Sequence, residues 1–285
     1  MRILVTGRSG YLGSAVVPAL RARGHEVVTI GRHPGSDAAC DLTDGGATRD
    51  AVRAVGDVDA VVHLAARAHD FRGLSLNDLL LANTVTTRNL IAALRSEGRI
   101  VAVRFVHASS VAVYELLDAT RGLTAEQVPY AASKVQAEQL LYAEPFHSLH
   151  LLRLAPIYDR SHLDDVAKRV FLPGTRLKLR LFPPPLHSLC SRDRAVQAIL
   201  NAVEDAAVTG RSISNVTDPR PFSQHELLNW FPGRSLPVPV SLLSALAGVS
   251  RLGGVNGRRV SQLINKFSCS SSYPSQSSTR HPGWP

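Results

Sequence analysis

A tyrosine and a lysine stand four residues apart in Tyr130-Ala-Ala-Ser-Lys134, a spacing that places both side chains on one face of a helix. A phenol ordinarily titrates near pH ~10, which is too high for proton transfer at neutral pH. A cation about 4 Å away, at an effective dielectric constant of ~20, is worth ~4 kcal/mol, or roughly three pKa units. Ser110 follows an apolar run at 101–108, where its hydroxyl can hold a carbonyl or alkoxide oxygen beside Tyr130. These three residues predict a proton-transfer site.

A glycine-rich turn follows the first apolar run, at residues 2–6, and opens a helical pattern at 11–23. Its first glycine can take a tight turn, its second lets the backbone approach a pyrophosphate, and its third lets the helix pack closely on the strand. The helix N-terminus adds free N–H groups and a partial positive charge. The turn therefore predicts a dinucleotide site, with a structural turn as the alternative. The residues expected to form it are Gly7, Arg8, Gly10, Tyr11, Leu12 and Gly13.

The end of the second apolar run, at residues 26–30, indicates which dinucleotide binds. A carboxylate at this place would hydrogen-bond the adenosine ribose 2′-hydroxyl of NAD. The run is followed instead by Gly31, Arg32 and His33, whose cationic groups suit a 2′-phosphate. We therefore expect NADP(H), with NAD(H) as the alternative and a solvated loop arginine as the other interpretation of Arg32. Asp41 is expected either to face the adenine edge or to cap a loop.

Apolar runs alternate with helical patterns in the first part of the chain. The runs cover residues 2–6, 26–30, 58–64, 101–108 and 149–154, and the helical patterns cover 11–23, 44–55, 76–96 and 130–143. Such alternation predicts a parallel sheet covered on both faces. We expect an α/β fold, a doubly wound parallel (Rossmann) sheet with a smaller C-terminal substrate lobe. The expected domains are a dinucleotide-binding domain at 1–156 and a mixed α/β lobe at 157–285, interleaved with the first.

Composition excludes several classes of protein. The 285 residues are 45% apolar and 19% charged, which is too apolar for a disordered chain. No apolar run reaches the ~20 residues of a membrane-spanning helix, and the N-terminus lacks a signal-peptide pattern. Cys40, Cys190 and Cys269 are too few and too scattered for a disulfide framework or a zinc site, so we expect a cytoplasmic protein without a metal. The net charge of +9, without a basic block or an RNA-binding aromatic motif, favours small phosphorylated ligands over nucleic acid.

Taken together, the motifs resemble the extended short-chain dehydrogenase/reductase superfamily, close to its NAD(P)-dependent nucleotide-sugar epimerase, dehydratase and reductase family. The resemblance covers residues 1 to about 230. The matching pieces are the glycine turn at 6–13, Asp41-Leu42, His63-Leu64-Ala65-Ala66, Asn83 with Asn89-Leu90, Ser109-Ser110, and Tyr130-x-x-x-Lys134. The final residues, His281-Pro-Gly-Trp-Pro285, look like the usual ending of the family.

The resemblance implies a role for each matching position. Tyr130 would be the general acid/base, Lys134 would bind the nicotinamide ribose and lower the phenol pKa, and Ser110 would orient the substrate oxygen. Asn83 also fits a helix-surface or capping position, and Pro156 also fits the end of a strand. Beyond the residues already named, the implied cofactor contacts are Leu42, Leu64, Ala65, Ala66, Asn83 and Pro156.

The expected reaction is hydride transfer at C4 of a nucleotide-activated sugar. Dehydratases of the family carry an acidic pair directly after the catalytic serine or threonine, whereas Val111 and Ala112 follow Ser110 here. Because Arg32 favours NADP(H), which cells keep reduced, we favour a 4-keto-sugar nucleotide reductase. The alternatives are a nucleotide-sugar 4-epimerase, a reductase of a non-sugar carbonyl and a non-catalytic NADP-binding sensor.

Basic residues of the C-terminal lobe suit a nucleotide diphosphate, with a solvated basic face as the alternative. Arg176 and Arg192 are the predicted substrate contacts among them. Glu115 and Asp159 replace glycines that the family usually has near the sugar, so the sugar stays open. His63, within an apolar run, is interpreted as a core residue. The basic cluster consists of Lys168, Arg169, Arg176, Lys178 and Arg180.

Two further expectations concern partners. Residues 238–252 form a short apolar helical pattern, which fits a helix packed on its own lobe or on a partner, or one lying on a membrane surface. The resemblance also implies a homodimer, because helices equivalent to 76–96 and 130–143 pair between subunits in relatives.

Overall fold

The computed structural model describes residues 1–67, 74–172, 175–207, 209–250, 264, 267–274 and 277–278. The chain divides into two compact units. The first comprises Met1–Leu154, Asp193–Val216 and Gln276–Pro285, and the second comprises Ala155–Arg192 and Thr217–Ser275. The sequence did not locate the return of the chain to the first unit at Asp193.

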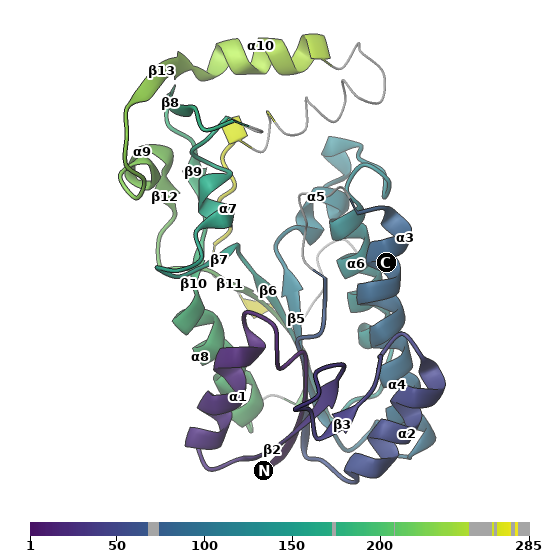
Figure 1. Cartoon of the computed structure of the whole chain (residues 1–285). Coiled ribbons are helices and arrows are strands. Elements are labelled where there is room, and N and C mark those ends of the chain that lie inside the picture. The colour runs from purple at the N-terminus through teal and green to yellow at the C-terminus, as the bar shows by residue number, and fades with distance from the viewer. Residues whose placement is uncertain are drawn as a thin grey trace. The chain divides into compact units, whose positions relative to one another are not determined.

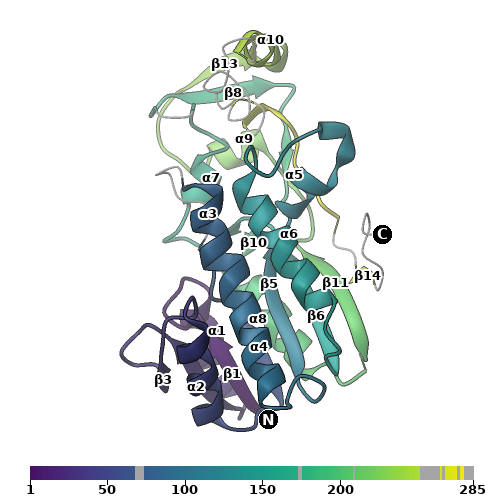
Figure 2. The ribbon, with the colours of Figure 1, turned by 90° about the vertical axis from the view of Figure 1, so that its right-hand side faces the viewer.

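An eight-stranded sheet forms the centre of the first unit, in the order β14-β11-β6-β5-β4-β1-β2-β3. Seven of its strands are parallel and β14 pairs antiparallel with β11, so the expected doubly wound parallel sheet is confirmed (Figure 2). The strands are β1 (Arg2–Thr6), β2 (Glu26–Gly31), β3 (Ala38–Ala39), β4 (Ala60–His63), β5 (Arg104–Ser110), β6 (Ser148–Leu154), β11 (Gly210–Val216) and β14 (Ser277–Ser278).

Helices cover both faces of this sheet, which explains why β4 and β6 are buried along their whole length. Figure 1 shows α1 (Gly13–Ala22) and α8 (Arg192–Glu204) on one face. The other face carries α2 (Gly45–Val55), α4 (Thr86–Ser96) and α6 (Pro129–Tyr142). Shorter helices are α3 (Leu76–Leu79), α5 (Val113–Leu117) and the 3₁₀ turn η2 (Ala119–Arg121).

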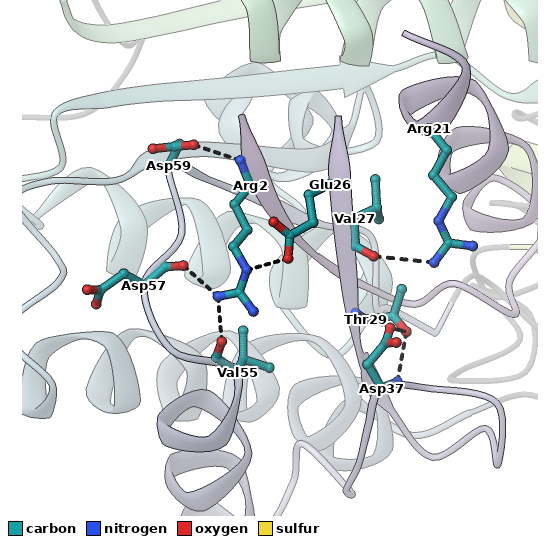
Figure 3. A network of polar contacts seen from close by, with 9 residues as sticks. All are labelled: Arg2, Arg21, Glu26, Val27, Thr29, Asp37, Val55, Asp57 and Asp59. Atoms are coloured by element: carbon teal, nitrogen blue, oxygen red, sulfur yellow. Dashed lines mark hydrogen bonds and ion pairs between the residues drawn. The ribbon is translucent and has the colours of Figure 1, made fainter. Parts of the chain in front are cut away.

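Polar contacts fix the amino-terminal edge of the sheet (Figure 3). The Arg2 guanidinium donates to the Glu26 carboxylate on β2 at 2.7 Å and to the Val55 carbonyl at the end of α2. The Arg2 backbone N–H donates to the Asp59 carboxylate just before β4 at 2.7 Å. One residue therefore ties β1 to both of its neighbouring strands.

The helical pattern expected at 76–96 contains an irregularity. The α3 helix begins with a capping box between Ser75 and Asp78, and six residues of π-helix, η1 (Leu80–Val85), separate it from α4. A π turn shifts the following side chains around the helix axis and often marks a functional site. Asn83 and Thr84 lie in this π-helical segment, and both are buried.

The second unit consists of short strand pairs and helices around two small apolar clusters. One cluster contains Val166, Val170 and Leu227, and the other contains Leu179, Leu181 and Leu243. The strand pairs are β7 (Ile157–Tyr158) with β10 (Cys190–Ser191), β9 (Leu186–His187) with β12 (Phe222–Ser223), and β8 (Lys178–Phe182) with β13 (Ser235–Pro239). Its helices are α7 (Asp164–Ala167), α9 (Gln224–Leu228) and α10 (Val240–Ser250). No described helix combines the length and apolar character required to cross a bilayer.

Candidate active site

The glycine turn between β1 and α1 has no room for side chains at two positions. Gly7 has φ +78°, and a Cβ there would lie 2.6 Å from the Ala65 nitrogen and 2.8 Å from the Leu64 carbonyl carbon. A Cβ at Gly13 would lie 2.1 Å from the Gly7 oxygen. The turn therefore packs directly against the loop after β4, so Leu64 and Ala65 lie beside the predicted dinucleotide site.

The N-terminus of α1 is open to an anion. Leu12 occupies the N-cap without a side-chain hydrogen bond, and the first turn has no acidic residue. Gly10 is exposed, and its backbone folds the turn by donating to the Gly7 carbonyl at 3.0 Å. Tyr11 is half-buried. The absence of a side-chain cap, the helix dipole and the glycines of the turn together fit a pyrophosphate.

The structure brings Lys134 to the carboxyl end of β5. The lysine is 2% exposed, and its Nζ donates to the Ala108 carbonyl at 2.9 Å. Ser110, two residues further along β5, is the last residue of that strand, and its Oγ accepts from the Ala112 N–H at 3.1 Å. Tyr130 is half-buried one helical turn before Lys134 on α6. The strand end and the helix thus supply the three side chains that the sequence singled out.

Burial lowers the pKa of Lys134 to about 8, and the nearby Glu138 carboxylate partly opposes this by favouring the charged form. Other ionisable side chains close to the ammonium are His63 and His107, on the neighbouring strands β4 and β5. Burial, followed by repulsion from Lys134, lowers the pKa of both histidines, so both are neutral at pH 7. Of these three described side chains, Lys134 is therefore the one that is positively charged at pH 7.

The pKa of Lys134 predicts a pH-dependent stability. Between pH 8 and about 10.5 the folded protein has released this proton while the unfolded chain still holds it, so stability increases with pH. Relative to a Lys134→Met variant, the natural protein should gain up to about 3 kcal/mol in free energy of unfolding across this window, at about 1.4 kcal/mol per pKa unit. Urea titrations at several pH values measure this difference, and parallel curves for the two proteins would contradict it.

Sequence reasoning missed a buried ion pair beneath these residues. Arg153 on β6 and Glu138 on α6 are both fully buried, and their atoms Nη2 and Oε2 lie 2.7 Å apart. Ser109 donates its hydroxyl to Glu138 Oε1 at 2.5 Å. The Arg153 guanidinium also lies over the Tyr114 ring, 4.9 Å from its centroid. An arginine within the apolar run at 149–154, and a glutamate four residues after Lys134, were the available signals.

His63 links the glycine turn to the π-helical segment. Its Nε2 lies 3.0 Å from Thr87 Oγ1, whose hydroxyl donates to the Asn83 carbonyl at 2.6 Å. Its Nδ1 lies 2.7 Å from Thr6 Oγ1, which accepts from the Ala65 N–H at 3.2 Å. This network assigns the neutral tautomer protonated on Nε2. Burial lowers the pKa of His63 to about 3, in agreement with its interpretation as a core histidine.

Asn83 joins the loop after β4 to α6, so its interpretation as a surface residue is wrong. Its Oδ1 accepts from the Arg67 N–H at 2.7 Å, and its Nδ2 donates to the Arg67 carbonyl at 3.1 Å. The same Nδ2 donates to Ser133 Oγ at 2.9 Å. Asn83 therefore positions the loop that contains Ala66, which is itself exposed.

Basic side chains gather around the end of β2. A Cβ at Gly35 would lie 3.3 Å from Arg8 Nη1 and 3.2 Å from His33 Nδ1, so both side chains reach the same point. Arg32 is exposed beside them. Asp41 Oδ1 accepts from the backbone and side chain of Thr43, both at 2.9 Å, which makes it a loop cap, whereas its neighbour Leu42 is buried in the core.

Three residues predicted to contact cofactor or substrate belong to the second unit. The Pro156 carbonyl accepts a hydrogen bond from the Cys190 N–H at 3.0 Å. Arg192 Nη1 lies 3.5 Å from an Asp159 carboxylate oxygen, and Arg176 is exposed.

Lys178 corrects the idea of a basic cluster open to a diphosphate. It is buried, and its Nζ donates to three backbone carbonyls at 2.7–3.1 Å, those of Leu228, Phe231 and Gly233. Leu228 is the last residue of helix α9 and the other two residues follow it, so the ammonium caps the C-terminal end of this helix.

Comparison with known proteins places this site in context. Residues 3–150 match the NAD dependent epimerase/dehydratase family. A 2-alkyl-3-oxoalkanoate reductase of Stenotrophomonas maltophilia is 35% identical over 173 residues, which cover 55% of this chain and 50% of the reductase. A dTDP-glucose 4,6-dehydratase of Neisseria meningitidis is 33% identical over 171 residues, 50% of this chain and 48% of that enzyme. The chain thus spans about half the length of these curated relatives.

Among solved structures, MoeE5 in complex with UDP-glucose and NAD superposes with a TM-score of 0.61. The two sequences are 24% identical, and the superposition covers 80% of each chain. At this identity the likeness supports a shared fold.

Proposed function

Because this chain belongs to the NAD dependent epimerase/dehydratase family, we propose that it is an NAD(P)-dependent oxidoreductase of a nucleotide-activated sugar, specifically a 4-keto-sugar nucleotide reductase. One observation carries the proposal: the buried Lys134 ammonium at the carboxyl end of β5, with Ser110 on that strand end and Tyr130 one helical turn away. In open α/β sheets, ligands bind outside the carboxyl ends of the strands.

The proposed chemistry assigns one task to each side chain. The nicotinamide ring, when bound, supplies the hydride that reduces the carbonyl carbon. Tyr130 donates its phenolic proton to the oxygen that becomes the hydroxyl, and Ser110 holds that oxygen by a hydrogen bond. Lys134 stabilises the phenolate that remains and binds the cofactor ribose. The close packing at Gly7 and Gly13 fits the dinucleotide phosphates.

A preference for NADP(H) rests on the end of β2. The acidic residue that would bind a free ribose 2′-hydroxyl is replaced there by Gly31 and Arg32. The nearby carboxylate of Asp37 is already held by the Thr29 hydroxyl at 2.7 Å and by its N–H at 2.8 Å, as Figure 3 shows in part. These two hydrogen bonds lower the pKa of Asp37, and the bond from the Thr29 hydroxyl has the larger effect. The family is described as NAD dependent, and MoeE5 was solved with NAD, so NAD(H) is the alternative cofactor.

Replacing Arg8 and Arg32 by alanine should raise KM for NADPH by about tenfold or more and leave KM for NADH nearly unchanged. The reason is that only the 2′-phosphate makes charge-assisted bonds with guanidinium groups. Steady-state kinetics with both cofactors measure the effect. Arg88→Ala, on helix α4, is the matched control. Equal loss with NADH and NADPH would contradict the NADP assignment.

The substrate class is tested by turnover. A UDP- or dTDP-linked 4-keto sugar should oxidise NADPH, measured as loss of its absorbance, with a 4-hydroxy sugar nucleotide as the product. Interconversion of UDP-glucose and UDP-galactose without net use of cofactor would identify a 4-epimerase instead.

A second candidate function follows from the first relative. Because that relative is a 2-alkyl-3-oxoalkanoate reductase, a 3-oxo acid is the alternative carbonyl substrate. Oxidation of NADPH by a 3-oxo acid, and not by keto-sugar nucleotides, would favour it. The cytoplasmic location and the homodimer stay predictions.

A further inference from the structure

Helix α10 exposes a stripe of large apolar side chains. Leu242, Leu246 and Val249 are 53%, 49% and 68% exposed. Their spacing of four and three residues places them on one face of the helix. Only Leu243 and Ala247, on a neighbouring face, are buried, and Leu243 packs in the cluster with Leu179 and Leu181. The helix is thus packed on its own unit by one face and leaves a second apolar face in solvent.

The remaining surface of α10 is weakly polar. Ser241, Ser244 and Gly248 are exposed, and the helix contains no charged residue. Both views of the ribbon show α10 at the outer edge of the second unit, beyond β13 and β8 (Figures 1 and 2). A contiguous exposed apolar stripe of this kind marks an interaction surface.

Charge indicates what kind of surface meets this stripe. The two stretches of the second unit hold 13 lysine and arginine residues against five aspartate and glutamate residues, a net charge of +8. The stretches of the first unit hold 19 lysine and arginine residues against 18 aspartate and glutamate residues, a net charge of +1. No acidic residue follows Glu226. Almost all of the excess positive charge therefore lies in the unit that carries the exposed helix.

Basic side chains also lie on the elements next to the helix. Arg234 is exposed just before β13, which leads directly into α10. Arg180 is exposed on β8, opposite Pro237 of β13. A second copy of this chain would bring the same positive charge against these arginines, so like-charge repulsion disfavours self-association through this face.

We infer that α10 docks the protein on an anionic lipid surface, with Leu242, Leu246 and Val249 inserted among the acyl chains. Apolar insertion and attraction to anionic headgroups reinforce each other in interfacial helices, and the exposed apolar stripe of α10 has no role in the proposed dinucleotide and sugar site. The inference is independent of the proposed reaction.

Co-sedimentation of the full chain with lipid vesicles tests the inference. The protein should bind vesicles of phosphatidylcholine with phosphatidylglycerol, bind pure phosphatidylcholine vesicles at least about tenfold more weakly, and dissociate as salt rises. A Leu242→Ser/Leu246→Ser variant should lose at least about tenfold in affinity for the anionic vesicles. Its circular dichroism and dinucleotide binding should match those of the natural protein, because both leucines are exposed.

Val101→Ser is the matched control, because Val101 is 58% exposed on the first unit. This variant should bind anionic vesicles like the natural protein. Failure of the natural protein to bind, or equal binding by the helix variant, would overturn the inference. Light scattering tests whether something else binds the apolar stripe. A dimer that forms without vesicle binding and is lost in the helix variant would overturn the inference in favour of self-association. A complex with an acidic protein that is lost in the same variant would overturn it in favour of that partner.

Discussion

The Tyr130→Phe variant is expected to lose about 1,000-fold in kcat while its affinity for the dinucleotide stays within about twofold, since a positioned general acid contributes 10²–10⁴-fold. The substitution removes one hydroxyl from a half-buried ring on α6 and leaves Lys134 and its contact with the Ala108 carbonyl in place. Stopped-time assays with the substrate proposed above give kcat, and quenching of protein fluorescence by NADPH gives the affinity.

Tyr142→Phe provides the matched control for this prediction. Tyr142 is the last residue of the same helix, and the Arg211 guanidinium lies over its ring, 4.9 Å from the centroid. The ring and that contact survive the substitution, so activity should be retained. If Tyr130→Phe kept more than about a tenth of the natural turnover, proton transfer by Tyr130 would be excluded as the main contribution.

The glycine turn and the residues at the end of β5 were accessible from sequence because their constraints are local. A left-handed φ at Gly7 and the absence of a Cβ at Gly13 are required within a single turn. Likewise, the spacing of Tyr130 and Lys134 fixes a shared helix face without knowledge of any partner. Such features need only the order of residues along the chain.

Features that depend on distant pairing were not accessible. Strand β11 pairs with β6 although about 60 residues separate them, and no periodicity in the sequence specifies which strand becomes a neighbour. Lys178 was expected to face a ligand, but it is buried among backbone carbonyls. The sequence could not show this, because those carbonyls belong to residues 50–55 positions away. The role of Asn83 stayed open for the same reason. Asn83 lies in the π-helical segment, and its hydrogen-bond partner Ser133 lies 50 residues away on α6.

The Arg153–Glu138 pair should give the largest effect on stability. Removing one partner leaves the other charge buried without its counter-ion, so Arg153→Met or Glu138→Gln should each lower the free energy of unfolding by about 3–5 kcal/mol. Because the desolvation cost of both charges disappears together, the double variant Glu138→Leu/Arg153→Met should recover most of that loss. Urea denaturation of the four proteins forms a double-mutant cycle.

Arg121→Ala breaks the exposed contact with Asp118 and should leave the urea midpoint unresolved from that of the natural protein, which calibrates the cycle. If the buried single variants also left it unchanged, the pair would make no net contribution to folding.

The double variant also tests the effect of the ion pair on the proposed active site. Its folded state keeps Lys134 buried but removes the carboxylate that favours the charged lysine, so the pKa of Lys134 should fall below about 8. The pH-dependent gain in stability described for the natural protein should then begin at lower pH, whereas a purely structural role of the pair would leave its onset unchanged. A shift of this onset would show that an ion pair beneath the site, invisible to motif matching, sets the charge of its lysine.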